Sequence, residues 1–94
     1  MTFQLLDLGA AGASLEFADG DLAGVRRAAA DIFDTVVETP AVDAQIWQLG
    51  EQRLFLTRDW DEYALLADSI DGVAVLRQLH AKLVAQPQRR MLAN

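Results

Sequence analysis

The feature that most restricts the fold is a run of apolar residues at helical spacing that begins just after Asp21. Its members are Leu22, Val25, Ala29, Ile32, Phe33 and Val36. Because residues three, four and seven positions apart share one face of an α-helix, these side chains would form a single apolar stripe. Asp19 or Asp21 could cap the first turn, and Pro40 would stop the helix soon afterwards. The sequence therefore predicts an amphipathic helix over residues 21–38.

A second helical stripe begins near residue 70. Its predicted buried members are Val73, Leu76, Leu79, His80, Leu83 and Val84. Asp68 or Ser69 could cap the free N–H groups at its start. Pro87 would end it, because proline lacks a backbone N–H and clashes with the preceding turn. The spacing predicts a helix over about residues 70–85.

The remaining apolar segments alternate with polar residues or form short apolar runs, which are the patterns of strands. These segments are residues 2–8, 13–18, 44–49, 53–58 and 63–67. Gly50 and Glu51 are expected to form a two-residue hairpin turn with glycine first, the preference of a type II′ turn. The predicted fold class is α+β in the order ββαβββα, a five-stranded antiparallel sheet with two helices packed on one face. The expected core includes Phe33, Leu54, Leu56 and Leu76, with Phe55 on the other face of its strand.

Charge separates the chain into a negative body and a basic end. Fourteen acidic against eight basic side chains give a net charge of −6, and residues 1–86 hold all 14 acids but six of the bases, which makes −8. We expect residues 1–86 to form a single α+β domain and residues 87–94 to form a short, basic, frayed tail. Because the body lacks the basic stripe that binds phosphates, neither nucleic acid nor an anionic membrane is an expected partner.

Residue types with catalytic chemistry are scarce. The chain has no cysteine, one histidine at His80, and two serines at Ser14 and Ser69. The absence of cysteine excludes a thiolate nucleophile or thiolate metal site, and the few histidine and serine residues leave no plausible nucleophilic triad. We therefore expect no catalytic residue, no cofactor and no metal site. No apolar run approaches the roughly 18 residues of a membrane helix, and the start lacks the basic segment of a signal peptide, so a cytoplasmic location is expected.

The segment RDWDEY at residues 58–63 combines residue types found at binding hot spots with a cluster of acids. Its members are Arg58, Asp59, Trp60, Asp61, Glu62 and Tyr63. Either Trp60 projects as the anchor of a protein-binding tip, or it folds back from a hairpin turn and covers its own sheet. The acids would steer a basic partner toward such a tip. The sequence alone leaves both alternatives open.

These features favour a small, acidic, non-catalytic protein-binding module of the inhibitor, immunity or adaptor type. It would dock on a basic protein partner or on its own copy. In length, acidity and lack of cysteine the chain is similar in bulk character to small bacterial inhibitors and immunity proteins. Two alternatives stay open. One is a small-molecule-binding dimer or enzyme in which Tyr63, Arg53 or His80 converge on a pocket, and the other is an acidic mimic of nucleic acid.

Overall fold

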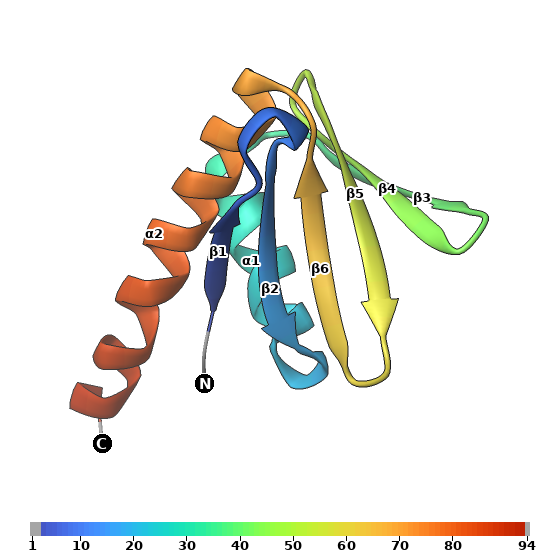
Figure 1. Ribbon diagram of the computed structural model, residues 1–94. Helices are drawn as coiled ribbons and strands as arrows, with labels where there is room; N and C mark the ends of the chain where they lie inside the picture. Colours follow the sequence, from blue (N-terminus) through green and yellow to red (C-terminus); the bar gives the residue numbers. More distant parts are fainter. Residues whose placement is uncertain (1–2, 94) are drawn as a thin grey trace.

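The computed structural model describes residues 3–93, with side-chain surroundings for residues 3–10 and 12–85. This part of the chain forms six strands and two α-helices (Figure 1). In chain order they are β1 (Gln4–Asp7), β2 (Ala13–Ala18), α1 (Leu22–Ile32), β3 (Val36–Ala41), β4 (Ala44–Leu49), β5 (Gln52–Asp59), β6 (Glu62–Ala67) and α2 (Ile70–Ala93). Two short 3₁₀ turns, η1 (Gly9–Ala11) and η2 (Asp19–Asp21), follow β1 and β2.

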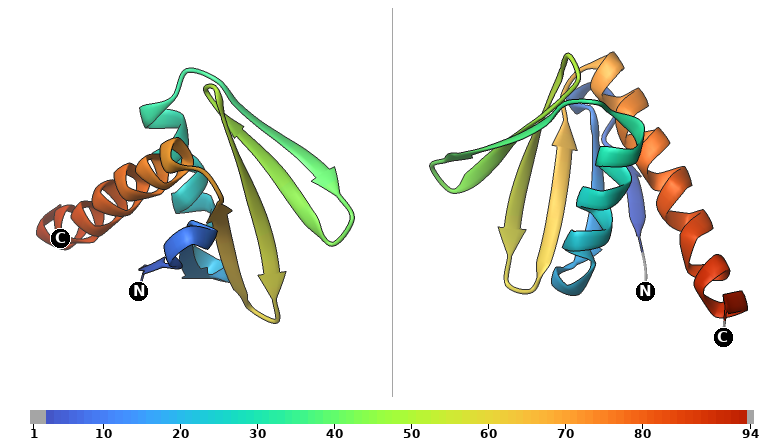
Figure 2. Two further views of the ribbon diagram at one scale, coloured as in Figure 1. Left: turned by 45° about the horizontal axis from the view of Figure 1, so that its top comes forward. Right: turned by 180° about the vertical axis from the view of Figure 1, so that it is seen from behind.

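The strands form one antiparallel sheet in the order β1-β2-β6-β5-β4-β3. Both helices lie on the same side of this sheet and contact each other (Figure 2). The predicted α+β class with two helices and an antiparallel sheet is confirmed. The sheet has six strands, however, and not the predicted five.

The extra strand, β3, begins at Val36, inside the predicted first helix (residues 21–38), and continues past its predicted end to Ala41. α1 ends at Ile32, and Phe33 already has extended backbone angles, φ −118° and ψ 136°. The segment that follows is rich in β-branched residues, which favour strands over helices. Val36 fits an inward strand position as well as the helical spacing, because it pairs with Leu49 and packs against the core. Pro40 lies within β3, an edge strand, where its missing N–H can face solvent.

The core fills the space between the helices and the sheet. Its largest fully buried side chains are Trp47, Phe17, Leu15, Leu49, Leu54, Leu65, Leu76, Leu79, Leu83 and Val25. The predicted core positions Leu54, Leu56 and Leu76 are buried. Phe33 is only half-buried and packs against the margin of the core. The strand register predicted for β5 is therefore correct, with Phe55 on the face away from the helices.

The helix starts differ in their capping. Ser69 caps α2 as predicted, because its Oγ accepts a hydrogen bond from the backbone N of Gly72 at 3.0 Å. Asp21 precedes α1, but its side chain makes no capping hydrogen bond. The chain instead enters α1 through the 3₁₀ turn η2, whose Asp19 is hydrogen-bonded to Asp61 in the turn between β5 and β6.

α2 departs from the predicted helix in its buried face and in its length. Val75 is buried, whereas Val84, which was assigned to the stripe, is 51% exposed, and His80 is half-buried. The helix also continues through Pro87 to Ala93, so the predicted end near residue 85 is wrong. A proline removes one hydrogen bond from a helix and strains it, but the backbone continues here in helical form.

Candidate protein-binding site

The turn between β5 and β6 carries the tryptophan of the predicted binding segment. Asp59 pairs with Glu62, so Trp60 and Asp61 form a two-residue hairpin loop at the lower end of the sheet in Figure 1. The side chain of Trp60 points away from the protein, and the residue is 90% exposed. The alternative in which the indole folds back onto its own sheet is therefore wrong.

Trp60 occupies a backbone conformation that tryptophan rarely adopts. Its φ is 61°, whereas Asp61 has no positive φ. Positive φ at the first loop residue alone is the pattern of a type II′ turn, where glycine dominates because a Cβ is unfavourable there. The β4–β5 turn obeys this rule, since Gly50 holds the same position with φ 60°. A bulky aromatic residue at this position is strained by about 1–2 kcal/mol.

Arg58 fixes the turn from the inner face of the sheet. Its Nε donates a hydrogen bond to the backbone oxygen of Trp60 at 2.9 Å. One of its terminal nitrogens lies 3.7 Å from Oδ2 of Asp19, and its guanidinium carbon lies 5.6 Å from the centre of the Tyr63 ring. Three contacts therefore restrict the guanidinium, and the turn is held in one geometry.

Tyr63 supports the turn by packing within the fold beneath it. Its ring stacks on Phe17 of β2, with centroids 5.7 Å apart and planes 20° apart. The residue is half-buried and belongs to the margin of the core. Of the six predicted residues, Arg58 and Tyr63 therefore support the turn, while Asp59, Trp60, Asp61 and Glu62 are exposed.

Asp19 belongs to the same site, although sequence analysis assigned it only a capping role. Its backbone N donates a hydrogen bond to the carbonyl oxygen of Asp61 at 2.7 Å, which joins η2 to the β5–β6 turn. Its carboxylate adds a further exposed acid beside the loop. Only the pairing of β2 with β6 brings Asp19 here, and a pairing across more than 40 residues leaves no local signal in the sequence.

The residues of the small-molecule alternative do not converge. Tyr63 lies on the helix-covered face of the sheet, and Arg53 lies on the opposite face, where it pairs with Gln48. His80 is on α2. None of these three residues lines the hollow of about 420 Å³ at the other end of the sheet.

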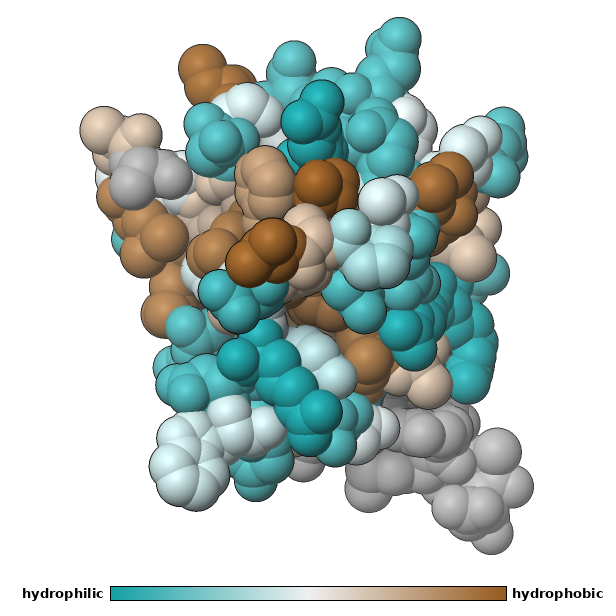
Figure 3. Space-filling view, turned by 90° about the vertical axis from the view of Figure 1, so that its right-hand side faces the viewer, coloured by the Kyte–Doolittle hydropathy of each residue, from teal (hydrophilic) through white to brown (hydrophobic). Residues whose placement is uncertain are grey.

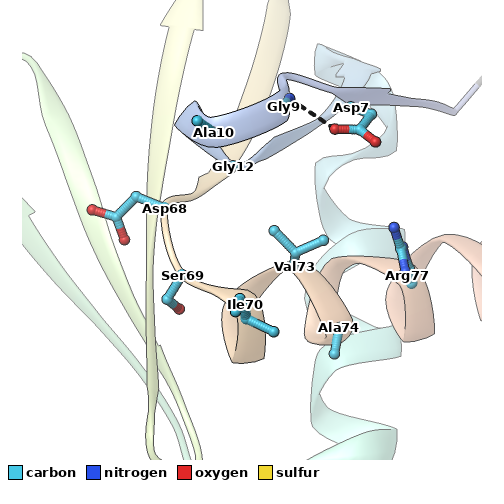
Figure 4. Close-up of a pocket in the computed structure, with 10 residues that line it drawn as sticks. All are labelled: Asp7, Gly9, Ala10, Gly12, Asp68, Ser69, Ile70, Val73, Ala74 and Arg77. Atoms are coloured by element: carbon cyan, nitrogen blue, oxygen red, sulfur yellow. Dashed lines mark hydrogen bonds between the residues drawn. The ribbon is translucent and has the colours of Figure 1, made fainter.

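That hollow lies between the β1–β2 connection and the start of α2 (Figure 4). Its polar side chains are Asp7, Asp68, Ser69 and Arg77. Asp7 and Ser69 are already hydrogen-bonded to the backbone. Asp7 Oδ1 accepts a hydrogen bond from Gly9 N at 2.8 Å, and Ser69 caps α2. Two of the four polar side chains of the hollow are thus already hydrogen-bonded to the backbone.

Residues 3–93 contain neither a cluster of three potential metal ligands nor a helix of membrane-spanning character. In that part of the chain, no three histidine, aspartate or glutamate side chains gather closely enough to hold a metal ion. None of the helices there combines the length and the apolar character required to span a bilayer.

The site consists of a strained, exposed tryptophan, a guanidinium that holds its turn, and four exposed carboxylates around it. Comparison with protein-family models, with curated proteins and with solved structures finds no match to this chain.

Proposed function

We propose that this protein is a non-catalytic binding module that docks its β5–β6 turn on a basic protein partner. The observation that carries the proposal is Trp60, which is 90% exposed and has a φ of 61° at a turn position that favours glycine. Strain of this kind persists where a side chain is needed for a purpose other than stability. Tryptophan is also among the residue types most enriched at the centres of protein interfaces.

The exposed side chain and the ordered backbone of Trp60 suit this residue to binding. An exposed tryptophan can bury a large apolar area in a partner's pocket and loses few rotatable bonds when it does so. The backbone beneath it is already ordered by Arg58, so little further entropy is lost on docking. The turn would therefore bind as a preformed tip.

The charge around the turn selects the partner. Asp19, Asp59, Asp61 and Glu62 are exposed beside Trp60, and the chain as a whole carries −6. Such a field attracts a basic surface and accelerates its association, and salt weakens this attraction. A basic protein is therefore the partner that fits both the anchor and its surroundings.

Affinity capture from the lysate of the host cell, with three baits, tests this function. The baits are the parent protein, Trp60→Gly, and Ile70→Ala as a control that removes another exposed apolar side chain, 89% exposed, at the other end of the sheet. A partner recovered in stoichiometric amount by the parent and by Ile70→Ala should be lost with Trp60→Gly. With the purified partner, Trp60→Gly should raise the dissociation constant by about 30-fold or more, which is the effect of a hot spot.

Equal affinity of the Trp60→Gly and parent proteins for that partner would refute a Trp60 anchor. If the affinity then depended only on the acids, and the partner were a nucleic-acid-binding protein, the mimic of nucleic acid would become the better explanation.

A further inference from the structure

The two sides of the β5–β6 turn differ in charge, as the strand register shows. Asp59 and Glu62 lie opposite each other and share the side of Phe55, which is the face of the sheet away from the helices. Arg58 lies on the helix-covered side, where one of its terminal nitrogens is 3.7 Å from the carboxylate of Asp19. The acid on the helix side therefore already has a cation beside it, and the turn presents its other acids on the opposite side.

The acids on the face away from the helices have no cation of their own in the described part of the chain. The ion pairs found there join Arg58 to Asp19, Arg26 to Glu38 and Lys82 to Asp31. Asp59 and Glu62 thus face each other as like charges on neighbouring strands, an arrangement that destabilises a sheet. Glu16 of β2 adds a third acid to this face, diagonal to Glu62. A cation supplied from outside would relieve the repulsion.

The surroundings of Trp60 restrict the kind of pocket that can receive it. Seen from the side of β3 and β4, hydrophilic residues prevail in the lower part of the molecule, at the height of the β5–β6 turn, and hydrophobic ones gather higher (Figure 3). In a pocket with only apolar walls, the carboxylates beside the indole would lose water without gaining a partner. The wall that contacts the indole should therefore carry a positive charge.

We propose that the partner presents an arginine whose guanidinium stacks on the indole of Trp60, from the side of the sheet away from the helices. The inference rests on the proposed function, because it names the chemical group that the Trp60 anchor binds. Among aromatic side chains, tryptophan attracts a cation most strongly. At the same turn the guanidinium carbon of Arg58 already lies 5.6 Å from the centre of the Tyr63 ring, whereas the indole has no such contact with a described residue.

Arginine fits this position better than lysine. A planar guanidinium stacks its flat face on a ring, keeps the N–H groups at its edge free to donate, and is more weakly hydrated than an ammonium group. The methylene stem of arginine adds apolar contact with the ring. The carboxylates of the turn stay at the hydrated rim, where they mainly accelerate association, while the stacked pair mainly sets the dissociation rate.

Titration of the intact chain with basic peptides, followed by NMR, tests the proposal. The probes are hexa-arginine and hexalysine, blocked at both ends and equal in charge. The chain has two tryptophans, so one indole N–H signal reports on Trp60 and the other, from the fully buried Trp47, is an internal control. Hexa-arginine should shift the Trp60 signal and leave that of Trp47 in place. Its dissociation constant should be about threefold or more below that of hexalysine.

Two matched variants separate the aromatic face of the indole from its apolar area. Trp60→Phe and Trp60→Leu both keep a Cβ at φ 61°, and the two new side chains are similar in apolar character, so they differ mainly in the ring. Both should show the circular dichroism of the parent. Toward the captured partner, Trp60→Leu should have a dissociation constant at least about fivefold above that of Trp60→Phe, through faster dissociation.

The proposal is overturned if the Trp60 signal does not move, or if hexalysine binds as tightly as hexa-arginine. It is also overturned if Trp60→Leu binds the captured partner as tightly as Trp60→Phe while Trp60→Gly is weakened. The Trp60 anchor would then stand, and its pocket would be apolar. Equal affinity of the Trp60→Gly and parent proteins would instead refute the anchor itself, and this inference with it.

Discussion

The guanidinium of Arg58 holds the backbone of Trp60, since its Nε donates a hydrogen bond to the Trp60 carbonyl oxygen at 2.9 Å. The same side chain lies 3.7 Å from the carboxylate of Asp19 on η2. The turn that presents the indole is therefore tied to a second element by a charged group. This tie stabilises a backbone angle at Trp60, φ 61°, that an isolated hairpin would give to glycine.

The first prediction separates stability from binding at this residue. Trp60→Gly should raise the free energy of unfolding by about 0.5–1 kcal/mol, because glycine adopts positive φ without a Cβ clash and the lost side chain is exposed. The same variant should lose partner affinity. Urea denaturation and a binding titration on one preparation measure both quantities.

Trp60→Ala is the matched control, because alanine keeps the Cβ and hence the strain. Its free energy of unfolding should stay within about 0.5 kcal/mol of the parent. A loss of about 3 kcal/mol in either variant, as for a buried aromatic residue, would mean that the indole packs against its own sheet after all.

The second prediction concerns the acids of the turn. The triple change Asp59→Asn, Asp61→Asn and Glu62→Gln should slow association with the basic partner and flatten the dependence of its rate on salt. The dissociation rate should change little, because the acids act mainly during approach. Stopped-flow or surface-binding kinetics at several salt concentrations give both rates.

A control triple removes the same charge elsewhere. Asp34→Asn, Glu51→Gln and Asp68→Asn alter exposed acids away from the β5–β6 turn. If both triples slow association equally, the attraction comes from the net charge of the chain, and the turn has no special part in it.

Local patterns were sufficient for most of the fold. Alternation placed Leu54 and Leu56 inward, and both are buried. The expected glycine turn at Gly50 has positive φ there and joins β4 to β5. The failure came at residues 33–38, where helical spacing continued but the helix has already ended at Ile32 and β3 begins at Val36. Val36 satisfies both periodicities, and only its pairing with Leu49 in the sheet decides between them.

The candidate site was predictable in composition but not in geometry. The segment from Arg58 to Tyr63 stood out because arginine, tryptophan and tyrosine lie within six residues of one another. Whether Trp60 pointed outward depended on its φ and on the hydrogen bond from Arg58, neither of which leaves a sequence signal. The contribution of Asp19 depended on a long-range strand pairing.

The third prediction tests the register of β5 with two neighbouring residues. Leu54 is fully buried, so Leu54→Ala should lower the free energy of unfolding by about 2–5 kcal/mol. Phe55 is half-buried on the face away from the helices, so Phe55→Ala should lower the free energy of unfolding by only about 1–2 kcal/mol. A larger loss at Phe55 than at Leu54 would contradict the register.

The last prediction uses two glycines in different environments. Gly12 has φ 110°, and a Cβ built there would overlap the carbonyl oxygen of Ala67. Because that oxygen belongs to the backbone of β6, the overlap can be relieved only by moving a strand, so Gly12→Ala should destabilise the fold by about 3 kcal/mol or more.

Gly24 lies within α1, and a Cβ there would meet no atom within 4 Å. Gly24→Ala should therefore stabilise the protein by about 0.5–1 kcal/mol, through the higher helix propensity of alanine. Thermal unfolding of the two variants beside the parent should show a lower Tm for Gly12→Ala and a higher Tm for Gly24→Ala. A Gly12→Ala variant as stable as the parent would mean that β2 and β6 do not approach each other as closely as the structure has them.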